Sequence, residues 1–156
     1  QVRVAFSADL IRWAKSLCNM AKVVLISCVS KKMPHKAKAK DIYISPLFKM
    51  NLEFARSFSP DKIFILSAKH GLIDLDKEIE PYDKTLNLMH SAEKKEWANN
   101  VLQDLRKVAD LSKDEFIFLA GENYRKYLVP YIKNYKIPLK GLSIGRQLQY
   151  LKEEIK

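Results

Sequence analysis

The chain has 156 residues with 47% hydrophobic and 29% charged side chains, which suits one globular domain large enough to enclose a core. Its apolar runs are too short to span a membrane, none has the form of a secretory signal, and two cysteines are too few for a disulfide framework. We therefore expect free thiols and a cytoplasmic location. The net charge of +10 favours a polyanionic partner, nucleic acid first, although a lysine-rich solvated surface explains the charge equally well.

Residues 1–22 carry an apolar stripe at helical spacing, with Ser7 placed to cap the helix. Met20 stands just before the first long apolar run and resembles a translation start. The sequence therefore predicts an N-terminal helical extension over residues 1–22 and a single α/β catalytic domain over residues 23–156.

Four apolar runs rich in β-branched and aromatic residues predict strands. They are Val23–Cys28, Ile63–Leu66, Phe116–Ala120 and the shorter Ile137–Leu142. Apolar stripes at helical spacing lie between and after them and predict helices. These helices run from Ser45-Pro46 to Phe58, from Ser91 to about Ala109, from Tyr124 to Tyr135 with a kink at Pro130, and from about Gly145 to Ile155. The alternation predicts a three-layer α/β/α sandwich around a mainly parallel sheet of four strands.

The stretch from Ile63 to Leu72 is central to this prediction, because a buried strand stops there abruptly at small and polar residues. With right-handed crossovers, the turns at the strand ends lie along one edge of the sheet and line one continuous cleft. These turns are residues 27–32, 67–76, 121–125 and 141–146. They hold the side chains that are best placed to carry chemistry.

His70 directly follows the central strand and is a candidate to polarise or protonate a leaving group, although a histidine that bonds only local backbone fits the turn equally well. Asp74, Asp83 and Glu122 are candidate water-activating carboxylates. Asp83 follows the rigid Pro81-Tyr82 pair, whereas Asp74 has the pattern of a turn former. Glu122 suits the first turn of a helix without any catalytic role. We therefore favour Asp83 over Glu122 as the catalytic carboxylate.

Cys28, beside Ser27 at the end of the first strand, is a candidate nucleophile, although a buried apolar role is commoner for such a cysteine. Five cations fall in the four turns and would line the cleft with groups suited to phosphates. They are Lys31, Lys32, Lys69, Arg125 and Arg146. The sequence lacks the Cys/His spacing of a metal site, a Walker lysine loop and a GxGxxG fingerprint, so we expect no metal and no nucleotide cofactor.

Several segments resemble a bacterial family that is catalogued as a domain of unknown function and often labelled YaaA-like. The most specific are Ser67-Ala68-Lys69-His70-Gly71-Leu72 and Pro81-Tyr82-Asp83-Lys84-Thr85-Leu86, and the others are Ile26-Ser27-Cys28 with Lys31-Lys32, Asp41-Ile42-Tyr43, Ala120-Gly121-Glu122 and Gly141-Leu142-x-Ile144-Gly145. The resemblance covers about Val23 to the end of the chain. It implies a fold like that of uracil-DNA glycosylases and the removal of modified pyrimidines such as 5-hydroxymethyluracil. The chain departs from those glycosylases because it has no Gly-Gln-Asp-Pro-Tyr segment and no histidine in its last third.

On this resemblance, the leading hypothesis is a monofunctional DNA glycosylase that flips a modified base from a DNA duplex into the strand-end cleft. His70 would contact the leaving base, and Asp83 or Glu122 would stabilise the sugar cation and orient water. The base pocket would be formed by Ser27, Cys28, Tyr43, Phe48 and Tyr82. Two alternatives stay open, namely a non-catalytic DNA-binding stress protein and a nucleoside or nucleotide hydrolase or transferase acting through Cys28.

Overall fold

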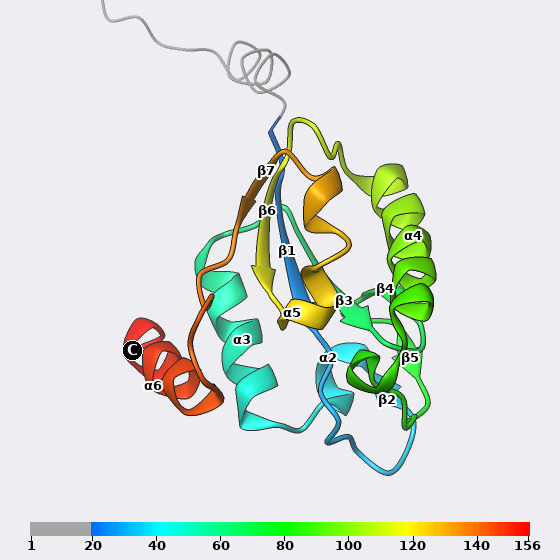
Figure 1. Cartoon of the computed structure of the whole chain (residues 1–156). Coiled ribbons are helices and arrows are strands. Elements are labelled where there is room, and N and C mark those ends of the chain that lie inside the picture. Colours follow the sequence, from blue (N-terminus) through cyan, green and yellow to red (C-terminus); the bar gives the residue numbers. More distant parts are fainter. Residues whose placement is uncertain (1–19) are drawn as a thin grey trace, which may run out of the picture.

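The computed structural model describes residues 20–156, and its main feature is a five-stranded sheet with the strand order β4-β3-β1-β6-β7 (Figure 1). Strands β3, β1, β6 and β7 are parallel, and β4 pairs antiparallel with β3 at one edge. The strands of this sheet are β1 (Lys22–Ser27), β3 (Lys62–Ser67), β4 (Gly71–Asp74), β6 (Glu115–Leu119) and β7 (Asn134–Lys136). Two short strands, β2 (Ala37–Lys38) and β5 (Glu78–Ile79), pair antiparallel with each other outside it.

Helices lie on both sides of the sheet. Figure 1 shows α3 and α6 on one side and α4 on the other. The helices are α2 (Ala39–Ile42), α3 (Pro46–Ser57), α4 (Ser91–Val108), α5 (Glu122–Arg125) and α6 (Ile144–Glu154), with 3-10 turns at η1 (Leu86–Leu88) and η2 (Val129–Tyr131). Helix α6 packs on α3, where the rings of Tyr150 and Phe54 meet edge to face with their centroids 6.0 Å apart. The mixed α/β class that the sequence predicts is therefore confirmed.

The interior positions of the central strands are apolar because these strands are covered on both faces. In β1, the side chains from Val23 to Ile26 have no exposed surface, and β6 is equally enclosed from Phe116 to Leu119. On α4, three residues of the inward face that the sequence predicts, Trp97, Val101 and Leu105, are buried, whereas the fourth, Val108, is exposed at the end of the helix. This core holds the carboxyl ends of β1 and β6 in fixed positions.

The order of the parallel strands places a ligand site between β1 and β6. Chain connections pass from β1 to β3 through α3, and from β3 to β6 through α4 on the opposite side of the sheet (Figure 1). The connection that leaves β1 and the connection that enters β6 therefore lie on different faces of the sheet, at the place where the strand order reverses. Such a topological switch point is where open α/β sheets bind their ligands.

The predicted sheet of four strands is wrong in two places. After β3 the chain turns back at once into β4, and the turn depends on Gly71, whose φ of +70° lies in the left-handed region. The last strand is Asn134–Lys136 rather than Ile137–Leu142. The helix predicted from Tyr124 to Tyr135 is reduced to α5 and η2, because Pro130 cannot donate the backbone hydrogen bond that a continuous helix needs.

The start of the chain is described only from Met20 onward. The helix expected over residues 1–22 therefore falls largely outside the described residues, as does Cys18, and β1 already begins at Lys22. Among residues 20–156, no helix is both long enough and apolar enough to cross a membrane.

Candidate functional site

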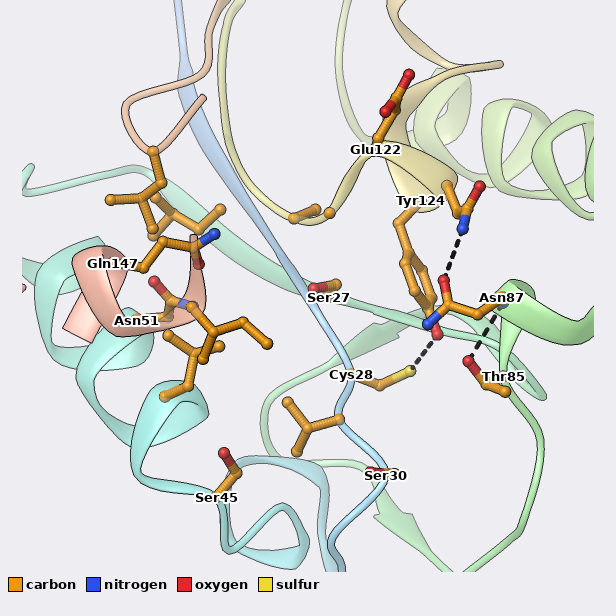
Figure 2. Close-up of a pocket in the computed structure, with 18 of the residues that line it drawn as sticks. Ser27, Cys28, Ser30, Ser45, Asn51, Thr85, Asn87, Glu122, Tyr124 and Gln147 are labelled. Carbon is orange, nitrogen blue, oxygen red and sulfur yellow. Dashed lines mark hydrogen bonds between the residues drawn. The ribbon is translucent and has the colours of Figure 1, made fainter. Parts of the chain in front are cut away.

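A cavity of about 590 Å³ lies at the switch point. Its walls come from the residues after β1, from the end of β6 and the start of α5, from the inner side of α3 and α6, and from the segment before η1 (Figure 2). The lining residues are 27–31, 45–47, 51, 84, 85, 87, 118–125, 137, 139, 144, 147 and 148. Five separate segments of the chain therefore converge on one space beyond the ends of the central strands.

Cys28 and Tyr124 form one wall of this cavity. The Cys28 thiol donates a hydrogen bond to the Tyr124 hydroxyl, with the two atoms 3.4 Å apart, and both residues are buried. Burial, with a smaller contribution from Cys28, raises the pKa of Tyr124 above its usual value. The Tyr124 hydroxyl therefore keeps its proton at neutral pH and is available as a hydrogen-bond donor inside the cavity.

Charged side chains stand at the mouth of the cavity. Lys31, Lys84 and Glu122 line it and are exposed, and Arg125 lies among them in a half-buried position. The Arg125 guanidinium donates to the carbonyl oxygen of Ala120 at 2.7 Å, which fixes it at the end of β6. Three cations and one carboxylate therefore border the opening. The cations suit the phosphate groups of a ligand, and the carboxylate remains available for chemistry on that ligand.

Amide side chains also contribute polar surface to the site. Asn123 donates to Asn87 at 2.6 Å and accepts from Lys94 at 3.1 Å, which ties α5 to η1 and to α4. Asn51 from α3 and Gln147 from α6 lie on the other side of the cavity (Figure 2). Sequence reasoning missed all of these residues, because an amide on a helix or in a loop carries no motif.

A second cluster of polar groups lies next to the cavity, under the loop after β3. The Ser67 hydroxyl donates to the Tyr82 hydroxyl, which also shares a hydrogen bond with the Tyr43 hydroxyl, and both distances are 2.8 Å. The backbone N–H of His70 donates to the Ser67 oxygen at 3.0 Å. Lys32 places its ammonium 4.2 Å from the centre of the Tyr82 ring. These contacts hold the loops at the carboxyl end of β3 together.

Ionisation in this second cluster is controlled by burial. Burial raises the pKa of Tyr43 to about 12 and lowers the pKa of Lys32, although Cys28 and Asp83 act on Lys32 in the opposite direction. Burial also raises the pKa of Tyr82, with Cys28 and Tyr43 adding to the effect. The two tyrosines therefore stay protonated and act as hydrogen-bonding supports.

The structure separates the residues that the sequence nominates into two groups. Those that line the cavity are Ser27, Cys28, Lys31, Glu122 and Arg125. Those that lie outside its lining, judged on the described residues, are Lys32, Tyr43, Phe48, Lys69, His70, Asp74, Tyr82, Asp83 and Arg146. The expectation of one cleft along all four turns is thus corrected. The turns after β1 and β6 meet in the cavity, and the turn at 141–146 contributes Ile144 to its lining. In the part of the chain that the structure describes, no residue of the turn at 67–76 lines the cavity.

The physical reasons for this separation are local. The turn at 67–76 folds back into β4 and away from the switch point, and it carries His70 with it. Tyr43 and Phe48 have no exposed surface, and their rings pack against each other with centroids 4.9 Å apart. Both side chains belong to the hydrophobic core, so they are not free to stack on a ligand.

His70 offers a test of this placement through the pH dependence of stability. Burial foremost, and then the charges of Lys69 and Lys77, lower the pKa of His70 below its usual 6.5. Its Nε2 atom is buried and has no hydrogen-bond partner among the described residues. As pH falls below 6.5, the unfolded chain therefore takes up a proton before the folded protein does, and stability is lost.

We expect His70→Asn to reduce that loss of stability below pH 6.5, because asparagine does not take up a proton. Above pH 6.5, the stability of the variant and of the wild type should change with pH in the same way. Thermal melts of both proteins from about pH 8 down to about pH 5 measure it, a range chosen to bracket an ordinary histidine. Parallel curves for the two proteins throughout this range would show that His70 titrates alike in the folded and unfolded states.

Comparison with known proteins places most of this chain in one family. A family model described as a family of unknown function (DUF6884) matches residues 23–153, which contain every residue that lines the cavity. No curated protein and no solved structure matches the chain. The family description contains no link to YaaA-like proteins or to uracil-DNA glycosylases. From residue 23 to residue 153, the chain belongs to the family of unknown function DUF6884.

Proposed function

We propose that the protein is a monofunctional DNA glycosylase. A modified pyrimidine such as uracil or 5-hydroxymethyluracil is flipped from the duplex into the cavity between β1 and β6, and its N-glycosidic bond is hydrolysed there. The observation that supports this proposal best is the cavity at the switch point, which combines an enclosed wall of amides and a phenol with cations at its mouth. The resemblance of the strand-end segments to YaaA-like proteins is consistent with it.

The dimensions of the cavity fit a single nucleotide. A volume of about 590 Å³ lies within the range of roughly 300–1,000 Å³ found for small-molecule sites. A flipped base needs hydrogen bonds to its edge and an apolar or aromatic surface against its face. The amides of Asn51 and Gln147 are suited to the first need, and apolar lining residues such as Leu47 and Ile144 to the second. The exposed cations Lys31 and Lys84, together with Arg125, are placed for the phosphates that flank the flipped nucleotide.

Glu122 is the carboxylate that the cavity offers for the reaction. Breaking the bond from C1′ to the base nitrogen leaves positive charge on the sugar and negative charge on the base. In the proposed step, the Glu122 carboxylate takes a proton from water as the water oxygen bonds to C1′, and the base leaves with the electron pair of the broken bond. The Tyr124 hydroxyl donates a hydrogen bond toward the departing base. Asp83 and His70, which lie outside the cavity lining, take no part in this scheme.

Two other functions use the same cavity differently. The thiol of Cys28 lines the cavity beside the Tyr124 hydroxyl, an arrangement that favours a nucleoside or nucleotide hydrolase or transferase with Cys28 as nucleophile. A DNA-binding stress protein without catalysis requires only the cations at the mouth.

Duplex oligonucleotides that carry different modified pyrimidines, incubated with the protein and then cleaved with alkali at abasic sites, separate these functions. We expect strand cleavage for uracil or 5-hydroxymethyluracil duplexes, and none for the unmodified duplex. Free nucleosides carrying the same bases should stay intact. Cleavage of the nucleosides alone would favour the hydrolase, and DNA binding without any product would favour the stress protein.

A further inference from the structure

The side chain of Asn51 is a polar group in a place where an apolar one would be expected. It lies on the inner face of α3 between Phe48 and Leu52, with 6% of its surface exposed, and it lines the cavity. Its Oδ1 atom is buried and has no hydrogen-bond partner among residues 20–156. Buried polar atoms in folded proteins are nearly always paired, so an unpaired one in a cavity wall points to a partner supplied by a ligand.

Gln147 stands next to this position on α6 and has only part of its amide engaged. Its Nε2 atom donates to the carbonyl oxygen of Leu142 at 2.9 Å, which fixes the orientation of the amide and leaves the second N–H of Nε2 as a donor. Figure 2 shows Asn51 and Gln147 on the same side of the pocket, across from Cys28 and Tyr124. The pocket therefore has one wall of amides and one wall with a phenol ring.

We propose that Asn51 and Gln147 together read the edge of a heterocyclic base that offers an N–H donor next to a carbonyl acceptor. Asn51 accepts from the ring N–H through Oδ1, and the second N–H of the Gln147 amide donates to the carbonyl. This assignment rests on the proposed function only in taking the cavity as the site of a nucleobase. It concerns binding alone, so it holds for a free nucleoside as well as for a base flipped from DNA.

Methylation at N3 of a uracil-type base removes the donor from this edge without changing the sugar. We therefore expect deoxyuridine to bind the wild-type protein on the order of tenfold more tightly than 3-methyldeoxyuridine. Titration followed by NMR, or by the shift in melting temperature, measures both ligands without catalysis and without a duplex. Equal binding of the two nucleosides, or no binding of deoxyuridine, would overturn the proposal.

Asn51→Leu separates a ligand-binding role from a structural one. Removing a buried, unpaired amide relieves a penalty in the free protein, so the melting temperature should stay the same or rise. The same change should remove the preference for deoxyuridine over 3-methyldeoxyuridine. Asn100→Leu on the exposed face of α4 is the matched control and should keep the preference. A clear fall in the melting temperature of Asn51→Leu, or retention of the preference, would assign Asn51 to structure.

Gln147→Met keeps the assignment testable even if position 51 does not tolerate leucine, because Gln147 is half-buried on a terminal helix. It should weaken the binding of both nucleosides, since both keep the carbonyl, and it should keep the preference for deoxyuridine that depends on Asn51. Loss of the preference for deoxyuridine in this variant, or unchanged binding of both ligands, would contradict the pairing. If this pattern holds and no duplex is cleaved, the base-reading assignment stands and the glycosylase proposal fails. If duplexes are cleaved but this pattern of nucleoside binding is absent, the glycosylase proposal stands and the base-reading assignment fails.

Discussion

Glu122→Gln is expected to lower the rate of base release by on the order of a hundredfold or more, with little effect on DNA binding or melting temperature. Glutamine keeps the size of the side chain but neither accepts a proton from water nor stabilises a positive sugar as a carboxylate does. Glu122 is exposed at the mouth of the cavity, so its replacement removes no packing from the core. Single-turnover release of base from a modified duplex, with protein in excess, measures the chemical step directly.

Asp83→Asn and His70→Ala provide the comparison for this result. Both residues lie near the ends of the central strands but outside the cavity lining, so each change should leave more activity than Glu122→Gln. Asp83 is exposed, and its charge acts on Lys32, which lies outside the cavity lining. A larger loss in Asp83→Asn than in Glu122→Gln would transfer the catalytic role to the segment after β5.

Replacement of Lys31 and Lys84 by alanine is expected to weaken DNA binding strongly at low salt and to flatten its dependence on salt. Each cation that contacts a phosphate contributes a slope of about 0.9 to the plot of log affinity against log salt concentration. Loss of both contacts should therefore lower the slope by roughly 1.8. Both lysines are exposed at the cavity mouth and lie on different segments, so the double change should not disturb the core.

A matched control exists at the amino ends of the strands, opposite the cavity. Lys113 and Lys133 are exposed and precede β6 and β7, so they lie near the ends of the strands away from the cavity. Their replacement by alanine removes the same net charge and should leave most of the salt dependence intact. Equal slopes for the two double variants would show that binding follows total charge rather than a defined phosphate site.

Much of the fold follows from local signals in the sequence. The runs that form β1, β3 and β6 are apolar and rich in β-branched and aromatic residues, which is the composition typical of strands buried on both faces. Helix α4 has a long apolar stripe, and it begins at Ser91 as predicted. By contrast, β7 has three residues and no buried side chain, so its pairing with β6 leaves little trace in the local pattern. Strand β4 was hidden because Gly71 and Asp74 look like parts of a turn.

The site was predictable only where topology determined it. Residues after β1 and β6 had to meet at a switch point, and this brought Cys28, Lys31 and Glu122 to one cavity. His70 satisfied the same rule of following a buried strand, yet the return of the chain through β4 removed it from the cavity lining. Asn51 and Gln147 depend on the packing of α6 against α3, which is a long-range contact without a local signal. Side chains that converge from distant elements need the three-dimensional structure to be found.

The most direct measurement for the central claim is the position of the target base in the complex. A duplex with 5-iodouracil at one site can be photo-crosslinked to the protein, and the attached residue identified by mass spectrometry. We expect the crosslink at Tyr124, the tyrosine that lines the cavity between β1 and β6. Crosslinking only to Tyr131 or Tyr135, which are exposed and lie outside the lining of that cavity in the described part of the chain, would contradict the account.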